Sequence, residues 1–189
     1  MLRIQTGSLK GISIPYSSQP GLRPTTQKVR EAVSNILKND WNDSSVADLF
    51  SGTGAYGLEA LSNGASQVVW VERDKKLVQA FKKFLKDRFP KREDSFQVFQ
   101  EDALLFLSRW SGDPVDILIL DPPYKFPLRK ELLSRLNLSD IVGPGTLIIL
   151  EFHHKDPYNA DLLQQKGFEL LKIYAYGESR LALLRRHIA

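Results

Sequence analysis

The segment ILILDPPYKF, at residues 117–126, joins an apolar run to groups that can do polar chemistry. The run stops at Asp121, and two prolines and Tyr124 follow. Proline lacks a backbone donor and fixes φ, so this turn is stiff and leaves carbonyl oxygens available. These groups suit a planar target with an exocyclic NH2, because Asp121 and the Pro122 carbonyl can accept its hydrogens while Tyr124 stacks on the ring. We therefore predict a catalytic site at Asp121, Pro122, Pro123 and Tyr124.

A second candidate site lies upstream in DLFSGTGAYGLEAL, where Gly52, Gly54 and Gly57 form G-x-G-x-x-G. Such glycines let the backbone turn tightly and let a ligand approach it closely. The loop can hold a dinucleotide pyrophosphate, hold another ligand, or be a packed turn with none. Asp48 lies four residues before the first glycine. Its negative charge would repel a pyrophosphate and would attract a cationic ligand. S-adenosylmethionine carries an amino group, a sulfonium and no phosphate, so the loop suits it better than NAD.

Carboxylates recur near the ends of the first four expected strands, at Asp48, Glu72, Asp102 and Asp121. Open parallel sheets bind ligands at the carboxyl ends of their strands, so four acids on one edge indicate a site. Glu72 can accept two hydrogen bonds from a ribose diol, which NAD and S-adenosylmethionine both carry. Asp102 can accept from an adenine amino group, cap its helix, or do both.

Together these residues suggest methyl transfer to an amino group. The amino lone pair of a nucleobase is delocalised into the ring and is a poor nucleophile. Two fixed acceptors would stabilise the positive charge that develops on nitrogen, and in-line alignment would supply much of the acceleration. This chemistry requires no metal. The structural alternative is a proline-rich loop that closes a strand, with Tyr124 as a surface aromatic.

The elements that must position these residues alternate between short apolar runs and helical stretches, which is typical of a parallel sheet covered on both faces. Strands are expected over 46–50, 68–72, 96–100, 116–120 and 146–152. Helices are expected after Thr25 or Thr26, over 54–62 and 74–87, briefly through Leu107, and over 127–136. Two further runs, FELLKIYAY and SRLALLRR, are separated only by Gly177-Glu178, so the sheet should finish with an antiparallel strand.

Composition excludes several kinds of chemistry. The 189-residue chain has no cysteine, which removes disulfides, thiolate zinc sites and the usual route to pyrimidine C5 methylation. Its three histidines do not suggest a metal centre, and we assign no role to His153 and His154. The net charge of +4 permits a polyanionic partner without requiring one. No run resembles a signal peptide or a spanning helix, so we expect a cytoplasmic protein without a membrane partner. The sequence offers few exposed apolar signals, which suggests a monomer.

The strings DLFSGTGAYGLEAL and ILILDPPY resemble the amino-directed S-adenosylmethionine methyltransferases. GLRPTTQKVREAVSNIL, at residues 21–37, narrows the resemblance to the RsmD-type bacterial family that methylates guanine N2 in small-subunit (16S) ribosomal RNA. The family implies a Rossmann-like α/β fold of seven strands, mostly parallel, with helices on both faces and strand 7 antiparallel between the fifth and sixth. It also implies an N-terminal β-hairpin extension, expected over residues 1–22, before a methyltransferase domain over 23–189.

The resemblance implies S-adenosylmethionine as cofactor and ribosomal RNA, or the assembling 30S particle, as partner. Carried over by motif, the cofactor-binding residues are Asp48, Phe50, Gly52, Thr53, Gly54, Glu72, Arg73, Asp102 and Ala103. Asp121 to Tyr124 would hold the guanine amine. RNA contacts are expected at Arg3, Lys10, Arg23 and Arg30, although Arg30 can equally pair with Glu59 as scaffold.

Other functions remain open from the sequence. One is methylation of adenine N6 in DNA or RNA, or of a glutamine amide, but such sites usually carry Asn where this chain has Asp121. Asp121 can accept from guanine N1–H as well as from the amine, which favours guanine. Another is a non-catalytic RNA-binding or assembly module, which would not need the acids and the DPPY turn. A third alternative is a dinucleotide-dependent oxidoreductase. It is the least favoured of the three, because the DPPY turn has no part in hydride transfer.

Overall fold

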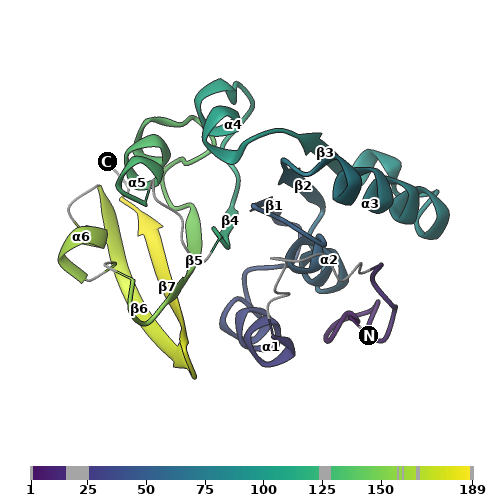
Figure 1. Ribbon diagram of the computed structural model, residues 1–189, viewed down its shortest axis with the longest axis horizontal. Helices are drawn as coiled ribbons and strands as arrows, with labels where there is room; N and C mark the ends of the chain where they lie inside the picture. Colours follow the sequence, from purple (N-terminus) through teal and green to yellow (C-terminus); the bar gives the residue numbers. More distant parts are fainter. Residues whose placement is uncertain are drawn as a thin grey trace.

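The computed structural model describes residues 2–15, 26–123, 129–156, 158, 160–164 and 167–187. Within them, a seven-stranded sheet has the order β3-β2-β1-β4-β5-β7-β6 (Figure 1). Its strands are β1 (Ser45–Leu49), β2 (Gln67–Glu72), β3 (Phe96–Gln100), β4 (Ile117–Leu120), β5 (Leu147–His153), β6 (Phe168–Tyr176) and β7 (Ser179–Arg186). β7 pairs antiparallel with β5 and β6, and the other pairs are parallel. The expected sheet, with strand 7 antiparallel between the fifth and sixth, is confirmed.

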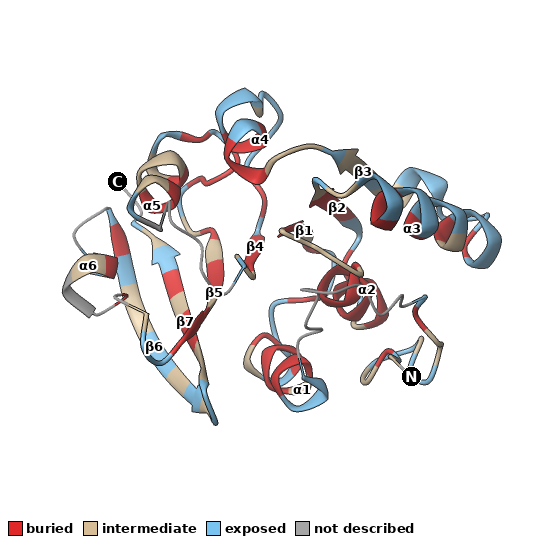
Figure 2. Ribbon diagram, viewed as in Figure 1, coloured by how far each residue is buried: buried red, intermediate tan, exposed pale blue. Residues whose placement is uncertain are grey.

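Helices cover both faces of this sheet, as the apolar runs of its central strands predict. Every residue of β4 is buried, because side chains on both of its faces meet a helix layer (Figure 2). The N-terminal segment, α1 (Gln27–Ile36), α2 (Ala55–Ser62) and α3 (Lys75–Arg88) share one core. The other core lies under α4 (Ala103–Arg109), α5 (Arg129–Leu138) and α6 (Ala160–Gln164). A short 3-10 helix, η1 (Glu93–Ser95), precedes β3.

Side-chain caps start the helices where the sequence predicts them. Thr26 accepts from the backbone N–H of Val29 at the start of α1. Asp74 accepts from the N–H groups of Lys76 and Leu77 at the start of α3. At the other end of a helix, Asn63 caps α2 and Gly64 follows with φ of 109°. No helix of the described residues is long and apolar enough to cross a membrane.

The N-terminal segment forms the expected hairpin ladder over its described part. Arg3 and Ser13 form an antiparallel bridge, and the N–H of Ile4 donates to Ile12 O at 3.0 Å. Ile4 and Ile14 are buried in the same core as α1 and α2. The division at residue 22 stays a prediction, because residues 16–25 lie outside the described residues.

Candidate active site

The predicted catalytic turn lies beside the glycine loop. β4 pairs with β1, and the backbone N–H of Asp121 points at Leu49 O across 3.5 Å. The chain leaves β1 for β2 on one side, while β4 lies on the other, so this is the point where the strand order reverses. Ligands bind at such points in open α/β sheets. Asp121 and the start of the glycine loop therefore share one edge.

The glycine loop adopts a backbone that few other residues tolerate. Phe50, which is not a glycine, has φ of 62°, and Gly52 and Gly54 have φ of 53° and 74°. Left-handed φ at a non-glycine residue is uncommon and concentrates at functional sites. These turns redirect the chain from β1 into α2, with Gly54 at its N-cap and no side-chain cap bond.

The three glycines of the loop are needed for different reasons. A Cβ on Gly54 would lie 2.3 Å from Cζ of Phe81, and one on Gly57 would lie 2.2 Å from Nε1 of Trp70. Both positions are therefore glycine because the core is packed against them. A Cβ on Gly52 would meet nothing nearer than Phe50 O at 4.0 Å. Only Gly52 faces open space, so only Gly52 leaves room for a ligand.

Asp48 is a carboxylate buried beneath this loop. It is 1% exposed, and its Oδ2 accepts from the N–H of Gly57 at 3.0 Å, while its Oδ1 has no hydrogen-bond partner. Burial raises the pKa of Asp48 from 3.8 to about 7; the charge of Glu72 also raises it, and the bond from Gly57 lowers it. The folded chain therefore prefers the protonated acid, so its stability falls as the pH rises from about 4 towards about 7.

Glu72 ties the glycine loop to the next strand. Its Oε2 accepts from the N–H of Gly52 at 2.9 Å, and its Oε1 accepts from the N–H of Asp74 at 2.8 Å. A carboxylate offers about four lone-pair positions, so these two bonds leave capacity for a ligand hydroxyl. Around it, Phe50 and Thr53 are half-buried, and Arg73 is exposed.

Asp102 caps α4, as one of the two interpretations of its sequence predicts. It accepts from the N–H groups of Leu104 at 2.9 Å and Leu105 at 3.3 Å, both through Oδ1. Ala103 is buried in the first turn of that helix. The second oxygen of Asp102 takes no part in the cap, so the adenine contact stays a prediction.

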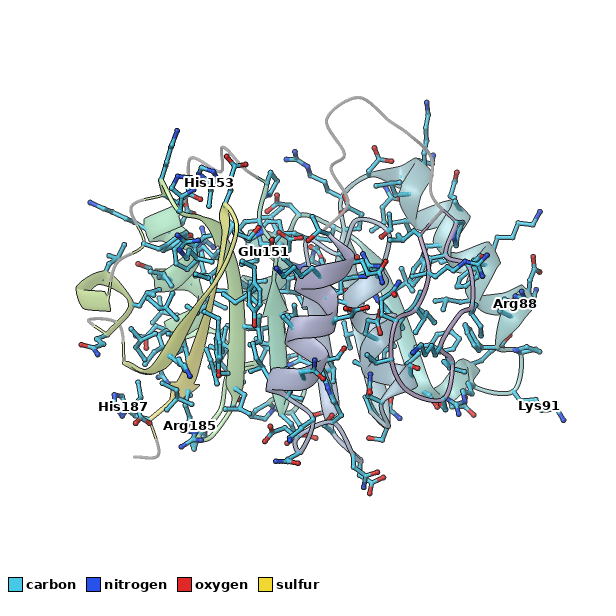
Figure 3. All side chains as sticks on the ribbon, turned by 90° about the horizontal axis from the view of Figure 1, so that it is seen from below. Arg88, Lys91, Glu151, His153, Arg185 and His187 are labelled. Carbon is cyan, nitrogen blue, oxygen red and sulfur yellow. The ribbon has the colours of Figure 1, made fainter. Side chains whose placement is uncertain are left out.

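Sequence reasoning missed two residues at this edge, Tyr56 and Glu151. The buried phenol of Tyr56 donates to Oε2 of Glu151 at 2.7 Å, and Ser179 also bonds to that carboxylate. Burial raises the pKa of Tyr56 well above its usual value, and Glu151, Asp121 and Asp48 raise it further. Figure 3 shows Glu151 at the same end of the sheet as His153. The sequence signal that could have found Glu151 is its position near the carboxyl end of its strand. Asp48 and Asp121 have the same kind of position on their own strands.

These contacts bring several acidic side chains together at one place. Burial raises the pKa of Glu151, which the bond from Tyr56 lowers in part. Three carboxylates surround the Tyr56 phenol closely enough to affect its ionisation. Such a site favours a ligand that brings positive charge, since bringing a cation near buried carboxylates offsets part of their desolvation. This agrees with the cationic ligand that the sequence predicts.

Three of the predicted RNA contacts, Arg3, Lys10 and Arg30, lie in the described part of the chain. Arg30 is 2% exposed, and its Nε lies 3.7 Å from Oε1 of Glu59, so the structure favours the scaffold role over an RNA contact. Glu59 also accepts from the N–H of Gln5 at 2.8 Å, which fixes the N-terminal segment to α2. Arg3 and Lys10 are exposed on that segment. Arg23 and Tyr124 lie outside the described residues.

His153, the last residue of β5, and His154, which follows it, make local structural contacts. The Nδ1 of His153 accepts from the N–H of Lys155 at 3.2 Å, and the N–H of His153 donates to Asp156 at 3.0 Å. His154 packs on the ring of His153, with 4.2 Å between ring centroids. Among the described residues, no group of three or more His, Asp or Glu side chains is arranged to hold a metal ion.

Comparison with known proteins identifies the family. The family model described as "Conserved hypothetical protein 95" matches residues 2–185. "Ribosomal RNA small subunit methyltransferase D" of Haemophilus influenzae is 33% identical over 90% of this chain and 86% of its own length. The protein of the same name from Escherichia coli is 31% identical over 94% and 93%. The solved structure "Putative methyltransferase yhhF from Escherichia coli" has a TM-score of 0.83 at 29% identity, covering 100% of this chain and 99% of that one. The chain therefore belongs to the RsmD-type family that its motifs resemble.

Proposed function

We propose that this chain is an S-adenosylmethionine-dependent methyltransferase that modifies the exocyclic N2 amine of a guanine in small-subunit ribosomal RNA. One observation carries the proposal: Asp121 lies at the end of the strand next to the glycine loop, with its N–H 3.5 Å from Leu49 O. The names of the relatives support a ribosomal RNA substrate. The choice of guanine rests on the carboxylate of Asp121, which can accept from N1–H and from the amine of the same base.

The residues at this edge fit the cofactor. The unpartnered Oδ1 of Asp48 is a buried acceptor that a cationic group can satisfy. Gly52 leaves open space above the loop, and Glu72 keeps acceptor capacity for ribose hydroxyls. When bound, S-adenosylmethionine supplies an electrophilic methyl group.

The chain's own residues orient and activate the amine. Asp121 and the Pro122 carbonyl would accept the amine hydrogens, which fixes the nitrogen and stabilises the positive charge that develops on it. The stiff Pro122-Pro123 turn holds these acceptors in place without reorganisation. Tyr56, through its bond to Glu151, keeps a second carboxylate fixed on the same edge. The negative charge of the Glu151 carboxylate would add to the electric field that stabilises the reacting nitrogen.

The proposal is tested by methylation with a labelled cofactor on three substrates: naked small-subunit RNA, assembling small subunits and DNA. We expect label in RNA and, after digestion to nucleosides, N2-methylguanosine as the product by mass spectrometry. Methyl groups on adenine N6, or only in DNA, would overturn the substrate assignment. No cofactor uptake by calorimetry would instead favour a non-catalytic binding module.

Asp48 predicts a pH dependence of cofactor binding. Because the pKa of Asp48 is raised to about 7, a cationic cofactor must displace its proton at lower pH. We expect the affinity to rise by up to about tenfold per pH unit towards pH 7 and to level off above it. Calorimetry in buffers of different ionisation enthalpy should show proton release below pH 7. Asp48→Asn, which keeps an acceptor for the Gly57 N–H, should bind more weakly and lose this dependence; an unchanged dependence would remove Asp48 from the site.

A further inference from the structure

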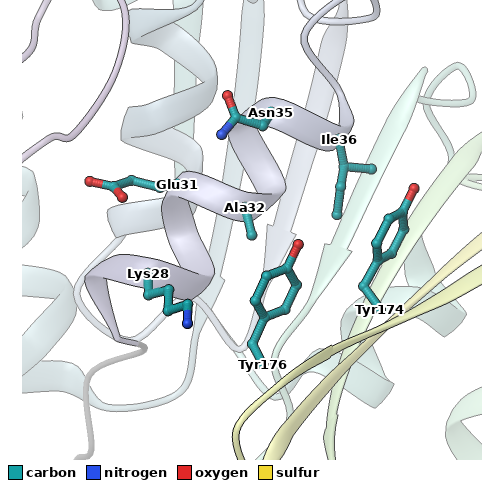
Figure 4. Close-up of a pocket in the computed structure, with 7 residues that line it drawn as sticks. All are labelled: Lys28, Glu31, Ala32, Asn35, Ile36, Tyr174 and Tyr176. Carbon is teal, nitrogen blue, oxygen red and sulfur yellow. The ribbon is translucent and has the colours of Figure 1, made fainter.

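An open groove of about 510 Å³ lies between α1 and β6, and no residue of the glycine loop lines it. Its walls are helix residues on one side and strand residues on the other (Figure 4). The lining residues are Lys28, Glu31, Ala32, Asn35, Ile36, Tyr174 and Tyr176. The structural and catalytic contacts described above use none of these side chains. The groove therefore needs its own explanation.

A β-bulge turns the tyrosines into this groove. The register of β6 against β7 shifts between Leu170 and Lys172. Before the shift, Leu170 packs on the core under α4 and α5; after it, Tyr174 and Tyr176 pack at the margin of the opposite core. Without the extra residue, side chains two or four positions apart would stay on one face. The irregularity is what brings two aromatic rings to the α1 side of the sheet.

The spacing of the two rings suits a planar ligand. Residues i and i+2 of a strand are about 6.7 Å apart, which is twice the stacking distance of about 3.4 Å in nucleic acids. In Figure 4, Tyr174 and Tyr176 project from β6 towards α1 with their hydroxyl groups pointing the same way. Both are half-buried, so part of each ring remains open to solvent. A nucleobase can stack on either ring or lie between them.

The charges around the groove suit a phosphate backbone. The Nζ of Lys172 lies 4.9 Å from the centroid of the Tyr174 ring, and Lys28 lies at the end of the groove near Tyr176 (Figure 4). The acid in the lining, Glu31, accepts from Nε2 of Gln27 at 2.9 Å, which holds it along the helix. Aromatic rings with cationic neighbours are the usual features of single-stranded nucleic-acid sites.

The groove opens at the same edge as the candidate active site. Tyr176 and His153 both pair with Ser179, so the ends of β6 and β5 lie level. Asp121 follows β4, three strand positions from β6. That separation is about 14 Å at the usual strand spacing, which a few nucleotides can span.

We propose that the groove between α1 and β6 binds an unpaired base of the RNA substrate, a few nucleotides from the target guanine, by stacking it on Tyr174 and Tyr176. This inference rests on the proposed function for the identity of the substrate. The site is sequence-tolerant, because every base offers an aromatic face. Its contribution is to substrate affinity, since neither ring touches the reacting groups.

The test compares Tyr174→Ala/Tyr176→Ala with wild type. Binding is measured by fluorescence anisotropy on a labelled single-stranded oligoadenylate about 12 nucleotides long. The double variant should raise its Kd by about 5- to 150-fold, and should raise the KM for small-subunit RNA similarly with kcat and cofactor affinity unchanged. Tyr174→Phe/Tyr176→Phe, which keeps both rings, should bind as wild type does. Lys172→Ala should lower the slope of log affinity against log salt by about one.

The matched control is Ile173→Ala, directly before Tyr174 and on the other side of β6, which should change the oligoadenylate Kd less than about twofold. If wild type methylates RNA and the double variant binds RNA equally well, the groove is not an RNA site and the proposed function stands. If wild type methylates no RNA, the proposed function fails independently of the binding result. A defect seen only with assembled subunits would show that the groove docks a protein, and would overturn the inference.

Discussion

Replacing Asp121 by alanine is expected to lower kcat for methyl transfer by about 100- to 1,000-fold while leaving cofactor affinity and thermal stability close to wild type. The reason is the position of the side chain. Asp121 is only half-buried and comes directly after the last buried residue of β4, so the core does not depend on it. Its carboxylate lies close enough to Tyr56 to affect the ionisation of that phenol, on the edge that carries the glycine loop. Single-turnover kinetics with saturating cofactor would measure the loss.

Two further variants separate the role of the carboxylate from a general effect of mutation. Asp121→Asn keeps one acceptor but cannot accept from the amine and from N1–H at once, so its loss should be smaller than that of alanine and specific to kcat. Asp113→Ala removes an exposed aspartate before the same strand and should leave turnover unchanged. If Asp121→Ala retained full activity, the turn after β4 would have no catalytic role.

The centre of the sheet was predictable because strands such as β1 and β4 are buried on both faces. A strand such as β4 must be apolar at every position, so ILIL marks it without reference to any neighbour. The starts of the helices were predictable from capping residues such as Thr26 and Asp74. Each cap accepts a hydrogen bond from a backbone N–H three residues later, so the signal is local. The short α6 was not predicted, because five residues give no helical period to recognise. The shift between Leu170 and Lys172 was also invisible, since it depends on pairing with β7.

The sequence predicted where the acidic residues of the candidate site lie, but not which groups form hydrogen bonds with them. Strand ends place Asp48 and Asp121 on one edge from sequence alone, because parallel strands all end there. Whether such an acid is satisfied depends on contacts from distant segments: Asp48 keeps an oxygen without a partner, while Asp102 caps its own helix. The bond between Tyr56 and Glu151 joins residues 95 positions apart, so no local pattern could reveal it.

The glycine loop shows the same limit. Its spacing predicted a turn that a ligand approaches closely, and one interpretation treated it as a packed turn instead. The structure confirms a packed turn at two of the three glycines, and the approach of a ligand stays a prediction for the third. Gly54 and Gly57 are packed against Phe81 and Trp70, while Gly52 borders open space. A motif cannot distinguish these roles, because all three positions require the absence of a side chain.

Gly54→Val is expected to destabilise the fold by about 3–5 kcal/mol, because two costs combine. The backbone there has φ of 74°, which a β-branched residue adopts only with strain. The new Cβ would also lie 2.3 Å from the Phe81 ring, which is buried against Trp70 and cannot move freely. Such a loss is a large part of the stability of an ordinary domain, so cofactor binding would fail through unfolding. Urea denaturation monitored by circular dichroism would measure it.

Gly52→Ala separates the ligand role of the loop from its packing role. Its φ of 53° costs about 1–2 kcal/mol for alanine, but its Cβ enters open space, so the domain should stay folded. The methyl group would occupy room that a ligand needs, and we expect the affinity for S-adenosylmethionine to fall by at least about tenfold. Calorimetry on the folded variant would measure this. If Gly52→Ala bound the cofactor as wild type does while Gly54→Val unfolded, the loop would serve only to join β1 to α2, and the cofactor site would have to be sought elsewhere on the sheet edge.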